Sequence, residues 1–340
     1  MGDLSSFVEG IVGQLGRSFF LNGFLPMLLL VAANQFILLA PPYVAGPLFT
    51  LFPTLQSPWL GLFSGEMMTA VVIALVLGFV VMPLNGFITR LFEGLFPGAK
   101  VLLSPLYIAR VSQHRKLYGL IAAKRAERLN MLAQVENGAE YNSDADFQLQ
   151  GVLDHLHSQQ EAKETIQVLP YNVKRLSPTM YGNAWAVMEE YPLVRYGIDS
   201  MVFWPYVRVA AGKENEALLE QIDNQKVLVD FATHLSLVLG ILTIEGIVWT
   251  VLHPDLRLGI LTLIALAFWF IFYQSAVSYV RTMGLLINQA FDLYRLNVLD
   301  MFDVKRPETL DEEYWAWNRL AAFIRRGEPF YFDMLDRVEK

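Results

Sequence analysis

The sequence contains no cysteine among its 340 residues. Disulfide bonds, thiolate nucleophiles and cysteine-ligated metal sites are therefore excluded. Charged residues are also scarce, at 17% of the chain, whereas an average soluble protein has about 25%. Apolar residues reach 54%, above the usual range of about 45–50%. This balance disfavours an ordinary soluble domain and indicates a chain with an unusually large apolar surface to bury.

Motifs for phosphate binding and acyl transfer are missing as well. The sequence has no GxxxxGK[ST] segment, no GxGxxG segment between a strand and a helix, and no GxSxG segment. His155 and His157 come nearest to a metal motif, but residues two apart on a helix point about 200° apart and cannot share one ion. We therefore predict no cofactor, no metal site and no catalytic residue, and we do not expect an enzyme.

Four apolar blocks are each long enough to cross a bilayer, which requires about 20 apolar residues per helix. They cover residues 19–40, 67–87, 227–251 and 258–280. Only one charged residue, Glu245, lies near the centre of a block. The chain is therefore predicted to be an all-α membrane protein with four transmembrane helices and a helical cytoplasmic domain.

Lysine and arginine predict the orientation of these spans. Residues 89–224 hold 14 of the 26 basic residues and residues 281–340 hold 9, whereas the loop 41–66 holds none. Basic residues accumulate on the cytoplasmic side of membrane proteins. We therefore predict a multi-pass protein of the plasma (inner) membrane with both termini and the long middle segment in the cytoplasm.

The predicted spans divide the chain into five parts. These are an N-terminal interfacial amphipathic helix (1–18), the first two spans with the outer loop 41–66 (19–88), a cytoplasmic helical domain (89–213), a long helical hairpin (214–303), and a cytoplasmic C-terminal helix and tail (304–340). The hairpin contains the third and fourth spans. Its arms are expected to extend out of the membrane, because no helix-breaking residue interrupts about 214–251 or about 256–302.

Two further helices are expected in the cytoplasmic parts. A long polar helix is predicted at about 103–136, and its basic residues between 110 and 128 favour anionic lipid head groups over nucleic acid, because flanking aromatic residues are few. Thr309 and Glu312 form a capping box that opens a tail helix, which is predicted to end at Arg326. Four apolar residues of this tail helix are expected to dock on the other cytoplasmic helices: Trp315, Trp317, Leu320 and Phe323.

Five polar residues lie inside the predicted spans, where they are costly and need partners. They are His234, Glu245, Gln274, Asn34 and Gln35. His234 and Glu245 are 11 residues apart and share one helical face. Gln274 is expected at the depth of His234, and Asn34 and Gln35 at the depth of Glu245. Hydrogen-bonded packing between spans is the favoured interpretation, and a polar path through an oligomeric pore is the alternative.

A motif-like stretch between residues 178 and 207 combines aromatic, charged and proline residues. Its candidate residues are Thr179, Gly182, Asn183, Glu189, Tyr191, Pro192, Arg195, Tyr196, Gly197, Asp199, Trp204 and Pro205. Thr179 is predicted to cap a short helix that ends before Pro192, and the charged residues are expected to pair with one another. Because no histidine, metal ligand or nucleophile lies beside them, we interpret the stretch as a structural clasp. Arg195→Ala or Trp204→Ala is therefore expected to lower folded yield or assembly.

Three segments resemble those of a family of bacterial membrane proteins. They are ITRLFEGLFP (88–97), PTMYGNAWAVMEEYPLVRYGID (178–199) and AFDLYRLNVL (290–299). The second is similar to the family pattern PTRxGN…E…YP..RYGID, which is followed by Trp-Pro, although Met180 stands where the family has arginine. The resemblance implies four spans and a long central cytoplasmic loop, and it implies no activity.

The sequence favours a homo-oligomeric pore as the function, and a non-conducting anchor or scaffold is the alternative. The first is a homo-oligomeric pore or channel whose cytoplasmic arms assemble the subunits, and the polar residues of the spans together with the nearly uncharged outer loop favour it. The second is a non-conducting anchor or scaffold that presents the cytoplasmic domain to a protein partner. The lack of a repeated polar ring along any one span favours this second function.

Overall fold

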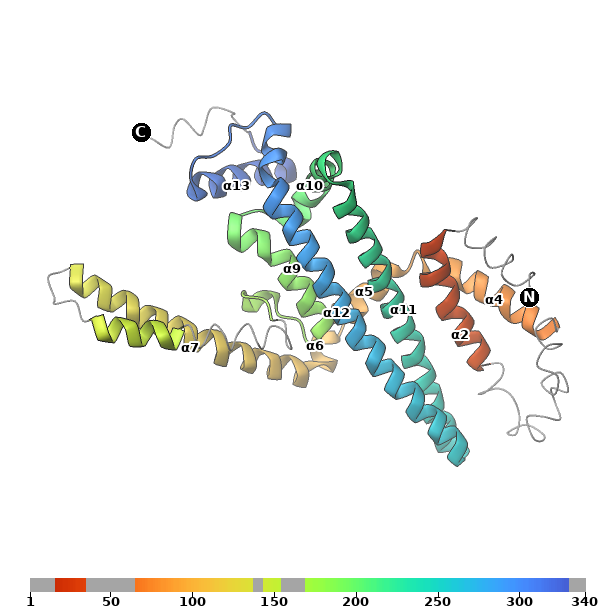
Figure 1. Ribbon diagram of the computed structural model, residues 1–340. Helices are drawn as coiled ribbons and strands as arrows, with labels where there is room; N and C mark the ends of the chain where they lie inside the picture. Colours follow the sequence, from red (N-terminus) through yellow and green to blue (C-terminus); the bar gives the residue numbers. More distant parts are fainter. Residues whose placement is uncertain (1–15, 35–64, 137–142, 154–168, 330–340) are drawn as a thin grey trace. The chain divides into compact units, whose positions relative to one another are not determined.

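The computed structural model describes residues 16–34, 65–136, 143–153 and 169–329 (Figure 1). Within these ranges the regular structure is helical and contains no strand, so the predicted all-α class is confirmed there. The elements are η1 (Phe19–Phe24), α2 (Leu25–Ala33), α4 (Gly65–Val81), α5 (Asn85–Glu93), α6 (Ala99–Leu102), α7 (Ser104–Glu136), η5 (Val173–Arg175), α9 (Met180–Tyr196), α10 (Ser200–Glu214), α11 (Glu216–Leu252), α12 (Leu256–Met301) and α13 (Leu310–Arg326). Most of the predicted N-terminal helix and outer loop, with Gln35, lies outside the described residues.

The chain forms two compact units. Unit 1 comprises residues 1–89 and 223–280, and unit 2 comprises residues 90–222 and 281–340. Helices α11 and α12 contribute residues to both units. The assignment of the predicted domains to membrane and cytoplasm stays a prediction.

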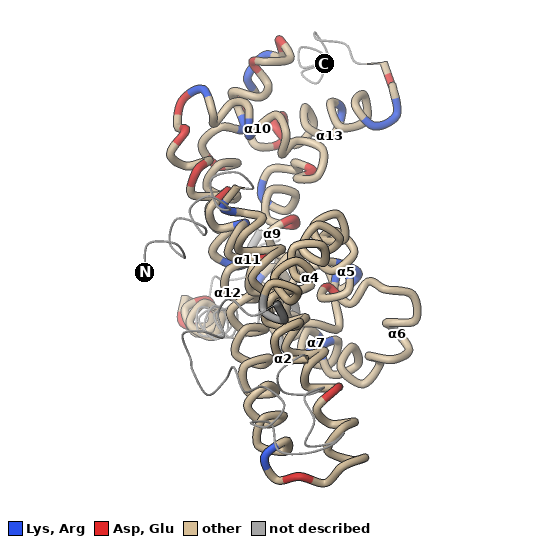
Figure 2. Tube along the Cα trace, turned by 90° about the vertical axis from the view of Figure 1, so that its right-hand side faces the viewer, with Lys and Arg blue, Asp and Glu red and all other residues tan. Residues whose placement is uncertain are grey.

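Two helices, α11 and α12, are long and apolar enough to cross a membrane, which indicates a membrane protein. Their ends agree with the prediction, since a helix-free turn containing Pro254 separates them. In unit 1 the two helices lie side by side, and Gln225 Nε2 of α11 donates a hydrogen bond to the Tyr279 carbonyl of α12 at 3.2 Å. Figure 2 shows few charged residues in the part of the hairpin that adjoins its charged tip.

The second apolar block does not form the single straight span that we predicted. Helix α4 ends at Val81, α5 begins at Asn85, and the two helices are bent by 71° at this break. Pro83 lies in the break, where it offers no N–H to the helix and restricts the residue before it. The described residues therefore contain two candidate spans, or three if this bent pair counts as one, and the first block is seen only as the short apolar segment Phe19–Ala33.

The two units have separate apolar cores. In unit 1 the buried residues Phe24, Met27 and Ala74 pack with Val238 of α11. The unit 2 core gathers buried residues of α9, α10, α12 and α13, with the Phe203 and Trp317 rings in edge contact at 4.8 Å. Helix α7 has the bounds predicted for the long polar helix, and the helical residues 143–153 contact it through a salt bridge between Arg128 and Asp146 at 2.7 Å.

Candidate functional site

The first part of the 178–207 stretch is a hydrogen-bonded joint at the start of α9. Thr179 Oγ1 accepts a hydrogen bond from the Gly182 N–H at 3.0 Å, so Thr179 is the predicted N-cap. Asn183 bonds the Ser177 backbone twice, accepting from its N–H at 2.7 Å and donating to its carbonyl at 3.0 Å. The Ser177 hydroxyl donates to the Glu93 carbonyl at the end of α5. The joint therefore connects two of the three segments that carry the family resemblance.

Pro192 does not end the helix, which corrects our prediction. Helix α9 passes through Pro192 and continues to Tyr196. A proline inside a helix leaves backbone carbonyls of the preceding turn without their usual donors. Pro192 removes the donor to the carbonyl four residues earlier, that of Met188. The next carbonyl, that of Glu189, accepts a hydrogen bond from the Ser200 hydroxyl at 2.9 Å. Pro205 likewise lies within α10, so both prolines belong to helices and neither terminates one.

The turn between α9 and α10 is built by Gly197 and Asp199. Gly197 has a φ of 75°, the left-handed conformation that ends many helices. The Asp199 carboxylate then accepts from the N–H groups of Met201 and Val202, at 3.1 and 3.3 Å, and caps α10. The same carboxylate pairs with Arg325 of α13 at 2.5 Å.

The acidic residues Glu189 and Asp199 form ion pairs with partners outside the stretch and not with Arg195, which is a second correction. Glu189 pairs with Arg175 at 3.8 Å. The Glu190 carboxylate accepts from the backbone N–H groups of Tyr171 and Asn172 at 2.6 and 2.9 Å. The prediction failed because these side chains project from different faces of two helices, so each meets a different neighbouring segment.

Asp292 of α12 is the centre of the most concentrated polar contact in unit 2. Tyr196 Oη donates to one of its carboxylate oxygens at 2.7 Å, and Tyr191 Oη lies 2.9 and 3.1 Å from the two oxygens. Arg195 donates to Tyr191 Oη at 3.0 Å. The Arg295 guanidinium stacks on the Tyr196 ring, 4.0 Å from its centroid. We call these five residues, with Glu313 and Trp317, the polar junction.

Glu313 connects α13 to this junction. Its Oε1 accepts from Arg295 Nε at 2.8 Å and from Trp317 Nε1 at 3.2 Å. Glu313 is 4% exposed and Trp317 is fully buried. Thr309 caps α13 and Gly327 ends it as predicted, and Trp317 and Leu320 dock as expected. The Glu312 carboxylate accepts from the Glu308 N–H, one residue before the N–H that a capping box uses. Trp315 and Phe323 are exposed instead, because they lie on other faces of the helix.

The ionisation states suit hydrogen bonding better than proton transfer. Burial, together with the hydrogen bond to the Asp292 carboxylate, raises the pKa of Tyr191 to about 12. Burial and the same carboxylate also raise the pKa of Tyr196. Both phenols therefore stay protonated at neutral pH and act as donors. The arrangement holds α9, α12 and α13 together.

The structure indicates different effects for Arg195→Ala and Trp204→Ala, which we expected to lower folded yield alike. Trp204 is half-buried, and its ring centroid lies 6.1 Å from that of Phe291 in the core. Arg195 is exposed. The loss of folded yield therefore remains our expectation for Trp204→Ala, whereas the loss of an exposed arginine should change folded yield little.

The polar residues of the unit 1 helices have unequal surroundings. Asn34 Nδ2 donates to Glu245 Oε2 at 3.1 Å and so joins α2 to α11. His234 is fully buried, and neither ring nitrogen reaches a partner in hydrogen-bond geometry among the described residues, although the Asn22 backbone lies beside the ring. Gln274 is half-buried and is not hydrogen-bonded to His234.

Helix α7 carries fewer free basic groups than its composition suggests. Lys124 pairs with Glu127 at 2.7 Å, and Arg128 pairs with Asp146. Arg115 and Lys116 are exposed. The attraction of this helix to anionic lipid stays a prediction.

Comparisons with protein-family models, with curated proteins and with solved structures found no match. The resemblance to a four-span bacterial family therefore stays an expectation. Sequence reasoning also missed the roles of Asp292, Arg295 and Glu313. The one available signal was the charged pair Asp292 and Arg295 inside the AFDLYR segment, within an otherwise apolar helical stripe.

Glu93 is expected to make unit 2 sensitive to pH. Burial, followed by repulsion from Glu189, raises the pKa of Glu93 from 4.5 to about 7. Between these two values the folded chain holds a proton that the unfolded chain has released, so stability falls as pH rises. We expect a loss of about 1–2 kcal/mol across this window, after allowance for solvent screening of a half-exposed carboxyl. Melting temperature against pH, measured on the purified protein in detergent, tests this.

The matched control is an exposed carboxyl in the same unit. Glu93→Gln should remove this part of the pH dependence, whereas Glu127→Gln should leave it intact, because Glu127 is exposed on α7. The same pH dependence in Glu93→Gln and in the unsubstituted protein would contradict the assignment.

Proposed function

We propose that this chain is a four-span protein of the plasma (inner) membrane that holds unit 2 in the cytoplasm, with both termini, and presents it to a protein partner. In this proposal unit 1 is the anchor and unit 2 is a helical platform. The observation that carries it is the polar junction. Its side chains bind one another across three helices of the same chain.

The second supporting feature is the composition of α12. This helix of 46 residues contains an apolar window long enough for a membrane span and also carries Asp292 and Arg295 of the polar junction. One continuous helix thus contributes to both the anchor and the platform. Exposed Arg115 and Lys116 on α7 support an additional contact of the platform with anionic lipid head groups.

A homo-oligomeric pore is a second candidate. Among the described residues, no hydrogen bond reaches the buried imidazole of His234 or the Asn22 side-chain oxygen. Polar groups inside membrane spans commonly mark ion or proton pathways. Almost all of the apolar window of α12 is exposed in the single chain, which supports contact with lipid or with further copies.

Reconstitution distinguishes the two functions. For the anchor we expect liposomes that contain the protein to retain potassium ions and a trapped fluorescent dye as well as protein-free liposomes do, because Glu245 is bonded within the chain. A leak above this control that Glu245→Gln or His234→Ala abolishes would reject the anchor and support the pore. A preparation of the surface variant Glu127→Gln with the same orientation in the liposomes serves as the control for handling.

The proposal that unit 2 binds a protein partner requires a test of its own. A photo-reactive amino acid placed in cells at Met201 or Leu310, both exposed in unit 2, should give a discrete cross-linked partner. The same group placed at Leu263, exposed in unit 1, should not give that product. Identical products from both units would contradict presentation by unit 2.

A further inference from the structure

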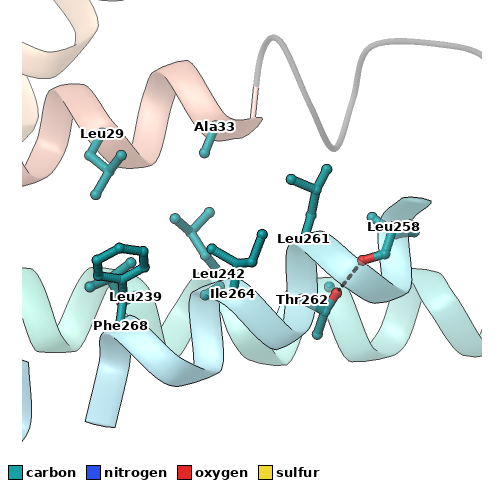
Figure 3. A pocket seen from close by; sticks show the side chains of 11 residues that line it. Leu29, Ala33, Leu239, Leu242, Leu258, Leu261, Thr262, Ile264 and Phe268 are labelled. Carbon is teal, nitrogen blue, oxygen red and sulfur yellow. Dashed lines mark hydrogen bonds between the residues drawn. The ribbon is translucent and has the colours of Figure 1, made fainter. Parts of the chain in front are cut away.

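Unit 1 contains an apolar pocket of about 230 Å³ between α2, α11 and α12. Figure 3 shows Leu29 and Ala33 of α2 facing Leu242 of α11 and Leu261 and Phe268 of α12. The Thr262 hydroxyl also lines the pocket, but it donates to the Leu258 carbonyl at 2.8 Å. The pocket therefore selects an apolar ligand.

The size of the pocket is sufficient for a bound molecule. A dry apolar cavity of about 150 Å³ already binds benzene in a small protein. An empty space of this kind deprives its lining of dispersion contacts. The two helices that form most of the wall are those long enough to cross a membrane, so acyl chains are the apolar molecules available to fill it.

The walls of the pocket are held in place by a hydrogen bond. Asn34 and Glu245, which bond at 3.1 Å, directly adjoin the lining residues Ala33 and Gly246. This contact fixes α2 against α11 at the side of the pocket. The pocket is therefore a built feature of unit 1.

The low exposure of several residues that line the pocket indicates that its ligand is narrow. Leu239, Leu242 and Leu258 line the pocket although they are only 8%, 7% and 2% exposed. A helix of a second copy is too wide to reach such residues, whereas a single methylene chain can reach them. We propose that this pocket binds the acyl chain of a membrane phospholipid. This inference depends on the membrane location of unit 1 and holds for an anchor and for a pore.

Photolabelling of the intact protein tests the proposal. The protein is reconstituted in phosphatidylcholine vesicles that contain a small fraction of phosphatidylcholine with a diazirine in one acyl chain, and labelled residues are mapped by mass spectrometry. A bound chain labels Leu239 and Leu242 more strongly than Leu263 and Phe270, which are 65% and 56% exposed. Labelling that follows exposure alone would overturn the proposal.

A pair of substitutions on α12 supplies the matched control. Ala265 lines the pocket, whereas Ala267 is exposed and lies about 200° away on the same helix. Ala265→Trp should remove the label from Leu239 and Leu242, and Ala267→Trp should preserve it. Ala33→Phe fills the pocket from the opposite wall and should act like Ala265→Trp. Equal labelling in folded Ala265→Trp and Ala267→Trp, verified by their melting temperatures, would also overturn the proposal.

Discussion

Glu313→Ala is expected to lower the free energy of unfolding of unit 2 by about 3–5 kcal/mol, because removing one partner of a buried ion pair leaves the other charge uncompensated. Arg295 and Trp317 both donate to the same Glu313 oxygen, and Glu313 is 4% exposed. Alanine would leave both donors without this acceptor. We expect the apparent melting temperature in detergent to fall by about 10 °C, and the amides of α13 to exchange faster.

The control for this prediction is an exposed acid on α12. Asp300 accepts from Arg306 at 2.5 Å, but the two side chains are 47% and 54% exposed, so Asp300→Ala should cost about 1 kcal/mol or less. Arg295→Met combined with Glu313→Leu should recover part of the stability, because no charge is then left unpaired. Equal losses in Glu313→Ala and Asp300→Ala would show that Glu313 does not hold α13.

The long helices could be predicted because their signals are local. Pro254 marks the turn between α11 and α12, and Thr309, Glu312 and Gly327 mark the ends of α13. Pro83 lies in a break between two helices, whereas Pro192 lies within α9. The local rule that proline interrupts a helix predicts a break at both positions. Helix α9 continues through Pro192 to Tyr196. Local sequence does not reveal which prolines the surrounding packing accommodates within a helix.

The candidate site could be predicted only in part for the same reason. The cap at Thr179 and the turn at Gly197 depend on neighbouring residues and were predicted correctly. The convergence of Tyr191 and Tyr196 on Asp292 joins positions 101 and 96 residues apart. Helical periodicity predicts which face of a helix is apolar, but it does not predict which polar residue of another helix meets that face.

Gly197→Ala is the second substitution with a large expected effect. Gly197 has a positive φ of 75°, which costs a residue with a side chain about 1–2 kcal/mol. A Cβ at this position would also overlap the Tyr314 ring of α13, approaching its Cε2 atom to 2.8 Å. Overpacking of this kind costs about 1–3 kcal/mol. We therefore expect a total loss of about 2–5 kcal/mol, measured as a lower melting temperature together with faster exchange in α13.

Gly327→Ala distinguishes the cost of the positive φ from the cost of the overlap with Tyr314. Gly327 ends α13 with a similar φ of 65°, but a Cβ there would meet no atom within 4 Å. Gly327→Ala should therefore lose only the conformational part, about 1–2 kcal/mol. Truncating the ring with Tyr314→Ala should reduce the difference between the two glycine variants, because it removes the atoms that the new Cβ meets. If both glycine variants lose equal stability with Tyr314 present, the close packing of α13 against the α9 turn is wrong, and only the backbone conformation matters.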